Sequence, residues 1–175
     1  MRDAFTIERA RPEDAAALLE YLKSIGGETE NLTFGAEGLS TSVEDEAALL
    51  AAQLDSRDDI YLVARADGQI VGDASLNRMP RRMSHRGELG IGVRQAWWGR
   101  GVGSALMAGL VDFAAANGFA QIELQVRSDN ARAIALYEKF GFRHLCTHPA
   151  FFRVDGADVD FQLMLLRLTG ETAER

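Results

Sequence analysis

The order of extended and helical segments predicts an α+β fold with three α/β/α layers. We expect a mixed, mostly antiparallel, twisted sheet of about seven strands with about four helices on its faces. Two observations carry this prediction. Three consecutive strand-like segments follow the second helix, which favours antiparallel pairing, and two later helices each connect single strands, which favours parallel pairing. The 47% hydrophobic content is enough to build a core in a chain of 175 residues.

The amino-terminal part begins with a strand and two helices. Residues 5–9 alternate apolar and polar side chains, which is typical of a half-buried strand. A helix is predicted over 12–23, because proline is tolerated in a first turn and the carboxylates there suit the positive end of the helix dipole. Residues 26–40 are rich in Gly, Thr and Asn and predict an irregular loop. Ser42, followed three residues later by an acidic side chain, opens the second helix.

The rest of the chain supplies the other strands and helices. Asp67-Gly68 is typical of a tight hairpin turn between strands at 60–66 and 69–78. Apolar side chains recur at helical spacing over 101–117, and Asn117-Gly118 ends that helix. We expect residues 1–168 to form a single domain and residues 169–175 a solvated tail. The remaining predicted elements are strands at 85–93, 121–126, 142–153 and 157–167, and a helix at 130–140.

Charge and composition exclude several classes of function. The formal net charge of -7 argues against a nucleic-acid partner, because such proteins need a basic face. The amino terminus is charged where a signal peptide needs an apolar run, and no run approaches the roughly 18 apolar residues of a membrane span. We therefore expect a cytoplasmic protein with no membrane partner. Cys146 is the single cysteine, expected to be a small core residue rather than a nucleophile, and no Cys/His pattern predicts a metal site.

A glycine-rich turn at 99–104 joins the strand at 88–93 to the start of a helix. The first amides of a helix lack internal acceptors and carry the positive end of the dipole, and glycines let phosphate oxygens approach the backbone. The turn is therefore a candidate pyrophosphate site, with tight strand-to-helix packing as the alternative explanation for its glycines. It lacks the lysine of a Walker A loop, and Gln95 and Ser104 stand where a dinucleotide fingerprint needs its third glycine. A nucleotide-binding module is thus disfavoured.

Two segments resemble the GNAT superfamily of acetyltransferases. VRQAWWGRGVGSALM at 93–107 resembles that family's coenzyme A pyrophosphate loop, whose core is Gln/Arg-x-x-Gly-x-Gly/Ala. Gly101 and Gly103 match the glycine pair, whereas Trp98 replaces the Gln or Arg. NARAIALYEKFGF at 130–142 is similar to the family segment Asn-x-x-Ala-x-x-x-Tyr-x-x-x-Gly-Phe. The resemblance implies the fold predicted above and transfer of an acetyl group from acetyl-CoA to an amine, without a metal.

The resemblance also implies how the coenzyme is held. The pantetheine arm would pair with the strand at 91–93, and the Val93 amide would polarise the thioester carbonyl. Gly90 and Gly92 fit a strand that bulges or admits another backbone closely. Asn130 would hydrogen-bond the arm or, alternatively, cap its helix. Arg100 would add a charge-assisted contact to phosphate. The expected coenzyme-binding residues are Ile91, Gly92, Val93, Trp98, Gly99, Arg100, Gly101, Val102, Gly103, Ser104, Asn130, Ala133 and Tyr137.

Acid and base candidates follow from the chemistry of amine acetylation. Tyr137 matches the family tyrosine and would protonate the departing thiolate; the alternative is plain packing in an apolar helix stripe. The acceptor amine arrives protonated, because an alkyl ammonium has a pKa of about 10. Glu88 is the candidate base, directly or through water, and His85 is the alternative because imidazole titrates near neutral pH. Glu88 could instead pair with Arg82 or Arg86, and His85 could be a surface residue.

Substrate choice is expected to come from the loop at 26–40, because loops on a rigid scaffold commonly carry specificity. Glu30, Thr33 and Phe34 are its candidate acceptor contacts. Further candidates lie in the final strand pair, namely Phe151, Phe152 and Asp160.

The predicted function is N-acetylation of a primary amine of a small molecule, an amino acid or a polyamine. The alternatives are a coenzyme A-binding regulatory module without catalysis and an N-acetyltransferase acting on proteins or peptides. Homodimers are common for this resemblance, so a homodimer is a further expectation.

Overall fold

The computed structural model describes residues 4–168 and, within that range, contains one seven-stranded sheet and four α-helices. The strand order is β1-β2-β3-β4-β5-β7-β6. β4 and β5 pair in parallel, whereas the β1–β2, β5–β7 and β6–β7 pairs are antiparallel, which confirms the predicted mixed sheet. The elements are β1 (Thr6–Arg9), α1 (Ala15–Glu28), α2 (Val43–Gln53), β2 (Asp59–Ala66), β3 (Gln69–Arg78), β4 (Arg86–Val93), α3 (Val102–Ala116), β5 (Gln121–Arg127), α4 (Ala131–Lys139), β6 (Arg143–Val154) and β7 (Ala157–Arg167), with short 3-10 helices η1 (Pro12–Asp14), η2 (Arg81–Met83) and η3 (Gln95–Trp97).

The described residues group into two compact units. The first holds residues 4–76 and Gly90–Val111, and the second holds Asn77–Leu89 and residues 112–168. The predicted coenzyme turn therefore belongs to the first unit, whereas Glu88 and Tyr137 belong to the second. The expected tail at 169–175 lies outside the described residues.

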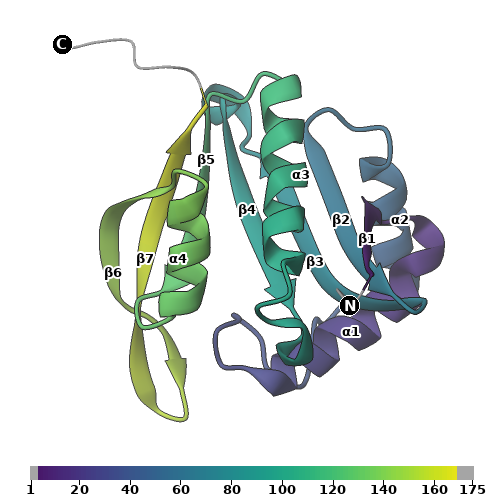
Figure 1. Cartoon of the computed structure of the whole chain (residues 1–175), viewed down its shortest axis with the longest axis horizontal. Helices are drawn as coiled ribbons and strands as arrows, with labels where there is room; N and C mark the ends of the chain where they lie inside the picture. Colours follow the sequence, from purple (N-terminus) through teal and green to yellow (C-terminus); the bar gives the residue numbers. More distant parts are fainter. Residues whose placement is uncertain (1–3, 169–175) are drawn as a thin grey trace. The chain divides into compact units, whose positions relative to one another are not determined.

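Helices cover both faces of the strands in the first unit (Figure 1). A Cβ added at Gly72 of β3 would lie 2.8 Å from Val102 Cγ1 and 3.1 Å from Leu106 Cδ1, so α3 packs directly on β3. The other face is covered by an apolar stripe of α1 that joins side chains of α2 and β2 in one buried cluster. Each large side chain in this cluster contributes about 1.5–3 kcal/mol through burial. The α1 side chains in the cluster are Ala15, Leu18, Tyr21, Leu22 and Ile25.

Helix α1 is longer than the sequence predicts. It runs to Glu28, so the prediction of an irregular loop is wrong for residues 26–28 and confirmed from residue 29 onwards. Gly26 is buried, and a Cβ there would overlap the carbonyl oxygen of Gly35. Glycine costs about 1 kcal/mol relative to alanine inside a helix. It is present because only glycine lets the following segment fold back onto the helix.

In the second unit, α4 lies in front of β7, next to the hairpin formed by β6 and β7 (Figure 1). Asp155 and Gly156 form the hairpin turn with φ values of 47° and 83°, as predicted. The pairing shifts register between His148 and Phe152. There the Ala150 amide donates to Asp160 Oδ1 at 2.9 Å, so Asp160 supports the irregular stretch of β6.

Cys146 is exposed on β6, so the prediction of a core cysteine is wrong. The physical reason is that β6 is the last strand of the sheet, and successive side chains along it are exposed on both faces. Its neighbour Leu145 is 58% exposed for the same reason. Among residues 4–168, no helix is both long and apolar enough to cross a membrane.

Candidate active site

The connection from β4 to α3 is a turn built around two left-handed glycines. A 3-10 turn over Gln95–Trp97 follows β4, and then Gly99 and Gly101 adopt φ values of 75° and 90°. These backbone angles, rather than lack of space, require glycine, because a Cβ at either position would meet nothing within 4 Å. The Ala105 amide makes a 3.0 Å hydrogen bond to the Gly101 carbonyl. The turn therefore has open space beside Gly99 and Gly101 and leads directly into the positive end of α3, two features that a pyrophosphate site requires.

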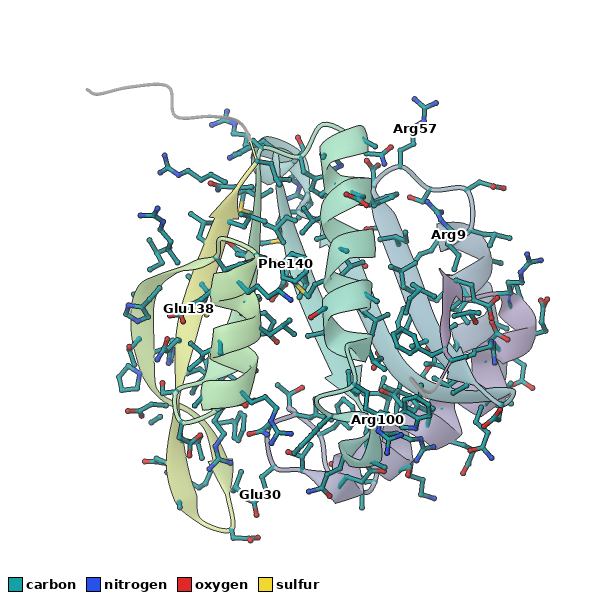
Figure 2. The ribbon with its side chains drawn as sticks, viewed as in Figure 1. Arg9, Glu30, Arg57, Arg100, Glu138 and Phe140 are labelled. Atoms are coloured by element: carbon teal, nitrogen blue, oxygen red, sulfur yellow. The ribbon has the colours of Figure 1, made fainter. Side chains whose placement is uncertain are left out.

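Trp98 holds the end of β4. Its indole Nε1 donates to the Val93 carbonyl at 2.8 Å. The residue that replaces the family's Gln or Arg thus fixes the peptide next to the predicted carbonyl-polarising amide. Arg100 lies at the turn before α3, with its guanidinium 5.1 Å from the centre of the Trp97 ring (Figure 2). This stacking places a positive charge beside the predicted phosphate site.

The two glycines of β4 have different reasons to be glycine. A Cβ at Gly92 would lie 2.7 Å from Asp73 Oδ1 and 2.8 Å from Ile25 Cδ1. Gly92 is therefore required by side chains of β3 and α1, a cause that the expectation of a bulge or of another backbone approaching did not include. A Cβ at Gly90 would meet only Ser75 Oγ, at an ordinary 3.4 Å.

Tyr137 is a buried side chain of α4 whose hydroxyl has no hydrogen-bond partner among the described residues. Its ring packs against Phe142, with centroids 6.0 Å apart, and the residue is 6% exposed. Among residues 4–168 its hydroxyl makes no hydrogen bond. Burial raises the pKa of Tyr137 well above its usual value, so the phenol keeps its proton at neutral pH. The buried ring agrees with the packing alternative, and the acid role of the hydroxyl stays a prediction.

Asn130 caps α4. Its Oδ1 accepts the Ala133 amide at 3.2 Å, which confirms the capping interpretation. The cap uses the acceptor oxygen and leaves the side-chain amide nitrogen, a donor, without a described partner. A coenzyme contact through that nitrogen is thus compatible with the cap, and Asn130, Ala133 and Tyr137 all belong to α4 or its cap.

Glu88 lies exposed on β4 and accepts a 3.4 Å hydrogen bond from Gln125 Nε2. It pairs in register with Glu123 of the parallel neighbour β5. Arg86 forms its ion pair with Glu123, so the alternative partnership of Arg86 with Glu88 is wrong. Glu88 is therefore an exposed side chain held by the neutral amide of Gln125.

His85 lies in the turn before β4 and is exposed. Its backbone carbonyl accepts the amides of Ala120 and Gln121 at 2.8 and 3.3 Å. These bonds give His85 a structural role at the start of the β4–β5 pair, in agreement with the surface alternative for its side chain.

The family model of the acetyltransferase (GNAT) family matches residues 27–142. The chain is 35% identical over 148 residues to the N-alpha-acetyltransferase RimI of Mycobacterium tuberculosis, an alignment that covers 75% of this chain and 90% of RimI. The chain belongs to the acetyltransferase (GNAT) family.

Other members of the GNAT family agree with this assignment. The L-amino acid N-acetyltransferase AaaT of Escherichia coli is 39% identical over 106 residues, covering 59% of this chain and 65% of AaaT. A GNAT-family acetyltransferase of Streptococcus pneumoniae superposes with a TM-score of 0.91 at 27% identity, covering 95% of this chain and all of that one. YncA of Salmonella typhimurium, solved with its cofactor acetyl-CoA, gives 0.83 at 25% identity, covering 97% of each chain. The chain is thus an acyltransferase that uses acetyl-CoA to acetylate amines.

The predicted acceptor contacts of this GNAT enzyme lie on the segment after α1. Glu30 and Thr33 are exposed, and Figure 2 shows Glu30 on this segment. Phe34 is half-buried and packs against the α1 cluster, so it anchors the segment. In the second unit, Phe151 and Phe152 pack against Phe161, with ring centroids 4.7 and 4.6 Å away.

Sequence reasoning missed a buried carboxylate behind Gly92. Asp73 of β3 accepts hydrogen bonds from Tyr21 at 3.0 Å and from Tyr61 at 2.8 Å. Burial raises the pKa of Asp73 to about 6, against the lowering effect of the two phenols; the charge of Glu46 adds to the rise. Burial and the Asp73 charge also raise the pKa of Tyr21 and Tyr61. The sequence of β3 gave no signal, because it does not reveal which α1 side chains lie opposite.

The charge on Asp73 opposes folding at neutral pH. A carboxyl whose pKa is higher in the folded protein contributes stability below its unfolded pKa of about 4, and that contribution is lost as the pH rises through about 6. The difference of about two pKa units corresponds to about 3 kcal/mol. The cluster therefore favours a folded state with a protonated or partly protonated Asp73 at mildly acidic pH.

Proposed function

We propose that this enzyme acetylates the primary amine of a small molecule, such as an amino acid or a polyamine, by direct attack on acetyl-CoA. The observation that carries the proposal is the exposed Glu88 carboxylate, which is bound to Gln125 and forms no ion pair with any residue of 4–168. An exposed carboxylate of this kind suits recognition and deprotonation of an ammonium group. The likeness to AaaT, named an L-amino acid N-acetyltransferase, supports an amino-acid acceptor.

In this proposal the chain holds acetyl-CoA through backbone groups of the first unit and side chains of α4. The amides of Gly99–Ser104 and the Arg100 guanidinium bind the pyrophosphate, and β4 residues 91–93 pair with the pantetheine arm. Trp98 supports this strand end through its bond to Val93. Asn130, Ala133 and Tyr137 complete the set. The open space beside the two left-handed glycines and the position of the turn at the start of α3 support this arrangement.

Acetyl-CoA supplies an activated carbonyl carbon, and the chain's residues move the protons. Glu88 accepts a proton from the ammonium, directly or through water, which frees the nitrogen lone pair. The Val93 amide donates to the carbonyl oxygen as the carbon–nitrogen bond forms. The nitrogen is positively charged after attack and loses its second proton to water. The Tyr137 hydroxyl donates its proton toward sulfur as the carbon–sulfur bond breaks, and a proton from water restores the phenol. Because burial raises its pKa, Tyr137 is present at neutral pH as the donor.

A second candidate acceptor is the amino terminus of a protein or peptide. The 35% identity to the N-alpha-acetyltransferase RimI favours it. A peptide acceptor carries further residues next to its amine, whereas a small amine does not. Acceptors of different length therefore distinguish the two candidates.

A thiol-release assay across an amine panel tests the proposal. The panel holds amino acids, polyamines and short peptides, each with acetyl-CoA. We expect turnover with free small amines at kcat/KM at least about tenfold above that with peptides. A preference for peptides would favour the RimI-like acceptor, and coenzyme binding without turnover on any amine would favour a regulatory module.

Replacing Tyr137 by Phe tests the acid. We expect kcat to fall by about 100-fold, within the range for general acid–base groups, with the dissociation constant of coenzyme A changed less than about threefold. Glu138→Gln is the matched control, because Glu138 is exposed on the same helix (Figure 2). An unchanged kcat in Tyr137→Phe would remove Tyr137 from this role.

Replacing Glu88 by Gln tests the base. We expect a loss of about 100-fold in kcat/KM for the amine near neutral pH, and a smaller loss at high pH, where the free amine no longer needs a base. If the Glu88→Gln rate near neutral pH equals that of the unaltered enzyme, another group carries the proton.

We also propose one domain over residues 1–168, a homodimer and a cytoplasmic location. The family match at 27–142 takes residues from both units, which supports one domain; a single calorimetric transition tests it.

The exposed edge strand β6 supports a dimer, because unpaired edges favour pairing with another chain. Light scattering of the unaltered protein and of Leu145→Glu tests it. The free Cys146 suits a reducing compartment, which cell fractionation tests.

A further inference from the structure

The last turn of α1 ends on a carboxylate that is unfavourable for the helix itself. Glu28 is the final residue of α1, at the negative end of the helix dipole, where a cation is preferred. It is half-buried, and Ser24 one turn earlier donates to its Oε1 at 3.4 Å. A locally unfavourable residue that is held in place points to a tertiary task.

That task is a contact with the turn that follows β4. Glu28 Oε2 accepts the Gln95 backbone amide at 2.7 Å. Gln95 is the first residue of η3, so the carboxylate satisfies an amide at the start of a helical turn. The distance is that of a strong charge-assisted hydrogen bond.

Arg94 completes the contact from the same turn. Its Nη1 donates to Ser24 Oγ at 2.7 Å and to Glu28 Oε1 at 3.3 Å, and its Nε donates to the Ile70 carbonyl at 3.1 Å. The guanidinium also lies 5.4 Å from the centre of the Tyr21 ring. Arg94 is thereby fixed by α1 and β3 together, so the end of β4 cannot move independently of α1.

The same end of α1 also carries the segment with the predicted acceptor contacts. Gly26 packs against the Gly35 carbonyl, and a Cβ at Gly38 would lie 3.2 Å from Lys23 Cα. Residues 29–38 are thus folded back on the helix that holds the coenzyme turn. The carboxyl end of α1 therefore contacts both residues 29–38 and the turn after β4.

We propose that Glu28 is a positioning residue for coenzyme binding: through the Gln95 amide it sets the turn that presents the amides of residues 99–104. The inference rests on the proposed coenzyme site. It assigns to Glu28 no contact with substrate and no proton transfer. The expected defect on its removal is therefore in the affinity for acetyl-CoA and not in the chemical step.

Two variants remove the hydrogen bond from opposite sides. Glu28→Ala deletes the acceptor. Gln95→Pro deletes the donor, at a first helical position after an extended residue, Arg94 with ψ 138°, where proline is tolerated. Glu28→Gln keeps an oxygen that can accept the amide. Glu20→Ala is the matched control, an exposed glutamate on the same helix.

The measurements are KM for acetyl-CoA, kcat with a saturating amine, and the dissociation constant of coenzyme A by calorimetry. We expect Glu28→Ala and Gln95→Pro each to raise KM and the dissociation constant about tenfold, with kcat within about threefold. Glu28→Gln should stay within about threefold of the unaltered enzyme. The double variant should be no weaker than either single one, because both remove the same bond.

Several results would overturn the inference. They are a coenzyme affinity of Glu28→Ala within twofold of Glu20→Ala, a Glu28→Gln variant as weak as Glu28→Ala, or additive losses in the double variant. If Glu28→Ala does not fold, Gln95→Pro is compared with Glu20→Ala instead. A coenzyme affinity of Gln95→Pro within twofold of Glu20→Ala would then overturn the inference. Failure of the unaltered protein to bind coenzyme A would contradict the proposed function itself, and this inference with it.

Discussion

Gly92→Ala is the substitution for which the structure gives the sharpest expectation. The added Cβ would lie 2.7 Å from Asp73 Oδ1, 2.8 Å from Ile25 Cδ1 and 3.4 Å from the Tyr21 hydroxyl, where ordinary contacts begin at 3.4 Å. The first two neighbours must therefore move apart by more than half an ångström. Both are buried, and Asp73 is fixed by two phenols, so neither can yield freely.

The magnitude follows from two costs. Overpacking a closely packed core costs about 1–3 kcal/mol. Displacing the Asp73 carboxylate weakens its hydrogen bond to Tyr21, and a bond to a charged group contributes about 1.5–3 kcal/mol. Small shifts of both neighbours relieve part of each cost. We therefore expect a loss of about 2–4 kcal/mol in the free energy of unfolding.

Gly90→Ala is the matched control on the same strand. Its Cβ would meet only Ser75 Oγ at 3.4 Å, and neither glycine has a left-handed φ. We expect a change within about 1 kcal/mol, in the stabilising direction if the entropy of the unfolded chain dominates. Urea unfolding followed by tryptophan fluorescence measures both variants. Equal stabilities within about 0.5 kcal/mol would refute the reasoning about Asp73.

Three further predictions use other parts of the first unit. In urea melts between pH 4 and 7.5, Asp73→Asn should gain stability relative to the unaltered protein as the pH rises through about 6, by up to about 3 kcal/mol; a difference independent of pH would contradict the assigned pKa. Trp98→Phe loses the bond to the Val93 carbonyl and should raise KM for acetyl-CoA about fivefold; an unchanged KM would show that this bond does not position the strand end. Gly101→Ala forces a Cβ onto a φ of 90° and should cost about 1–2 kcal/mol of stability and weaken coenzyme binding; full stability and affinity would mean that the turn relaxes without strain.

The course of the chain was predictable because local physics sets it. Hydrophobic periodicity and turn residues located most of the described strands and helices to within a few residues, and β3 and β7 at their observed bounds. The end of α1 was misplaced, since Gly26 looks like a helix terminator in sequence and is instead a contact point for Gly35. Cys146 was misassigned, because the sequence does not say that β6 ends the sheet.

The candidate site divides in the same way. The glycine turn before α3 and the Asn130 cap were predictable, because a tight turn and a helix cap are made by residues close together in the sequence. The roles of the turn and of Tyr137 toward acetyl-CoA stay predictions. Gln125 beside Glu88 and Glu28 on the Gln95 amide were not predictable, because each joins residues far apart in the chain. No periodicity records such pairs.

By itself, the sequence determined the elements, the glycine turn between β4 and α3, and the kinship to acetyltransferases. These depend on local backbone preferences and on residues a few positions apart. The tertiary structure decided why Trp98 stands in the turn, why Gly92 must be glycine and what surrounds Asp73. Those features arise from contacts between side chains of different elements, and only the packed chain brings such atoms within a few ångströms of one another.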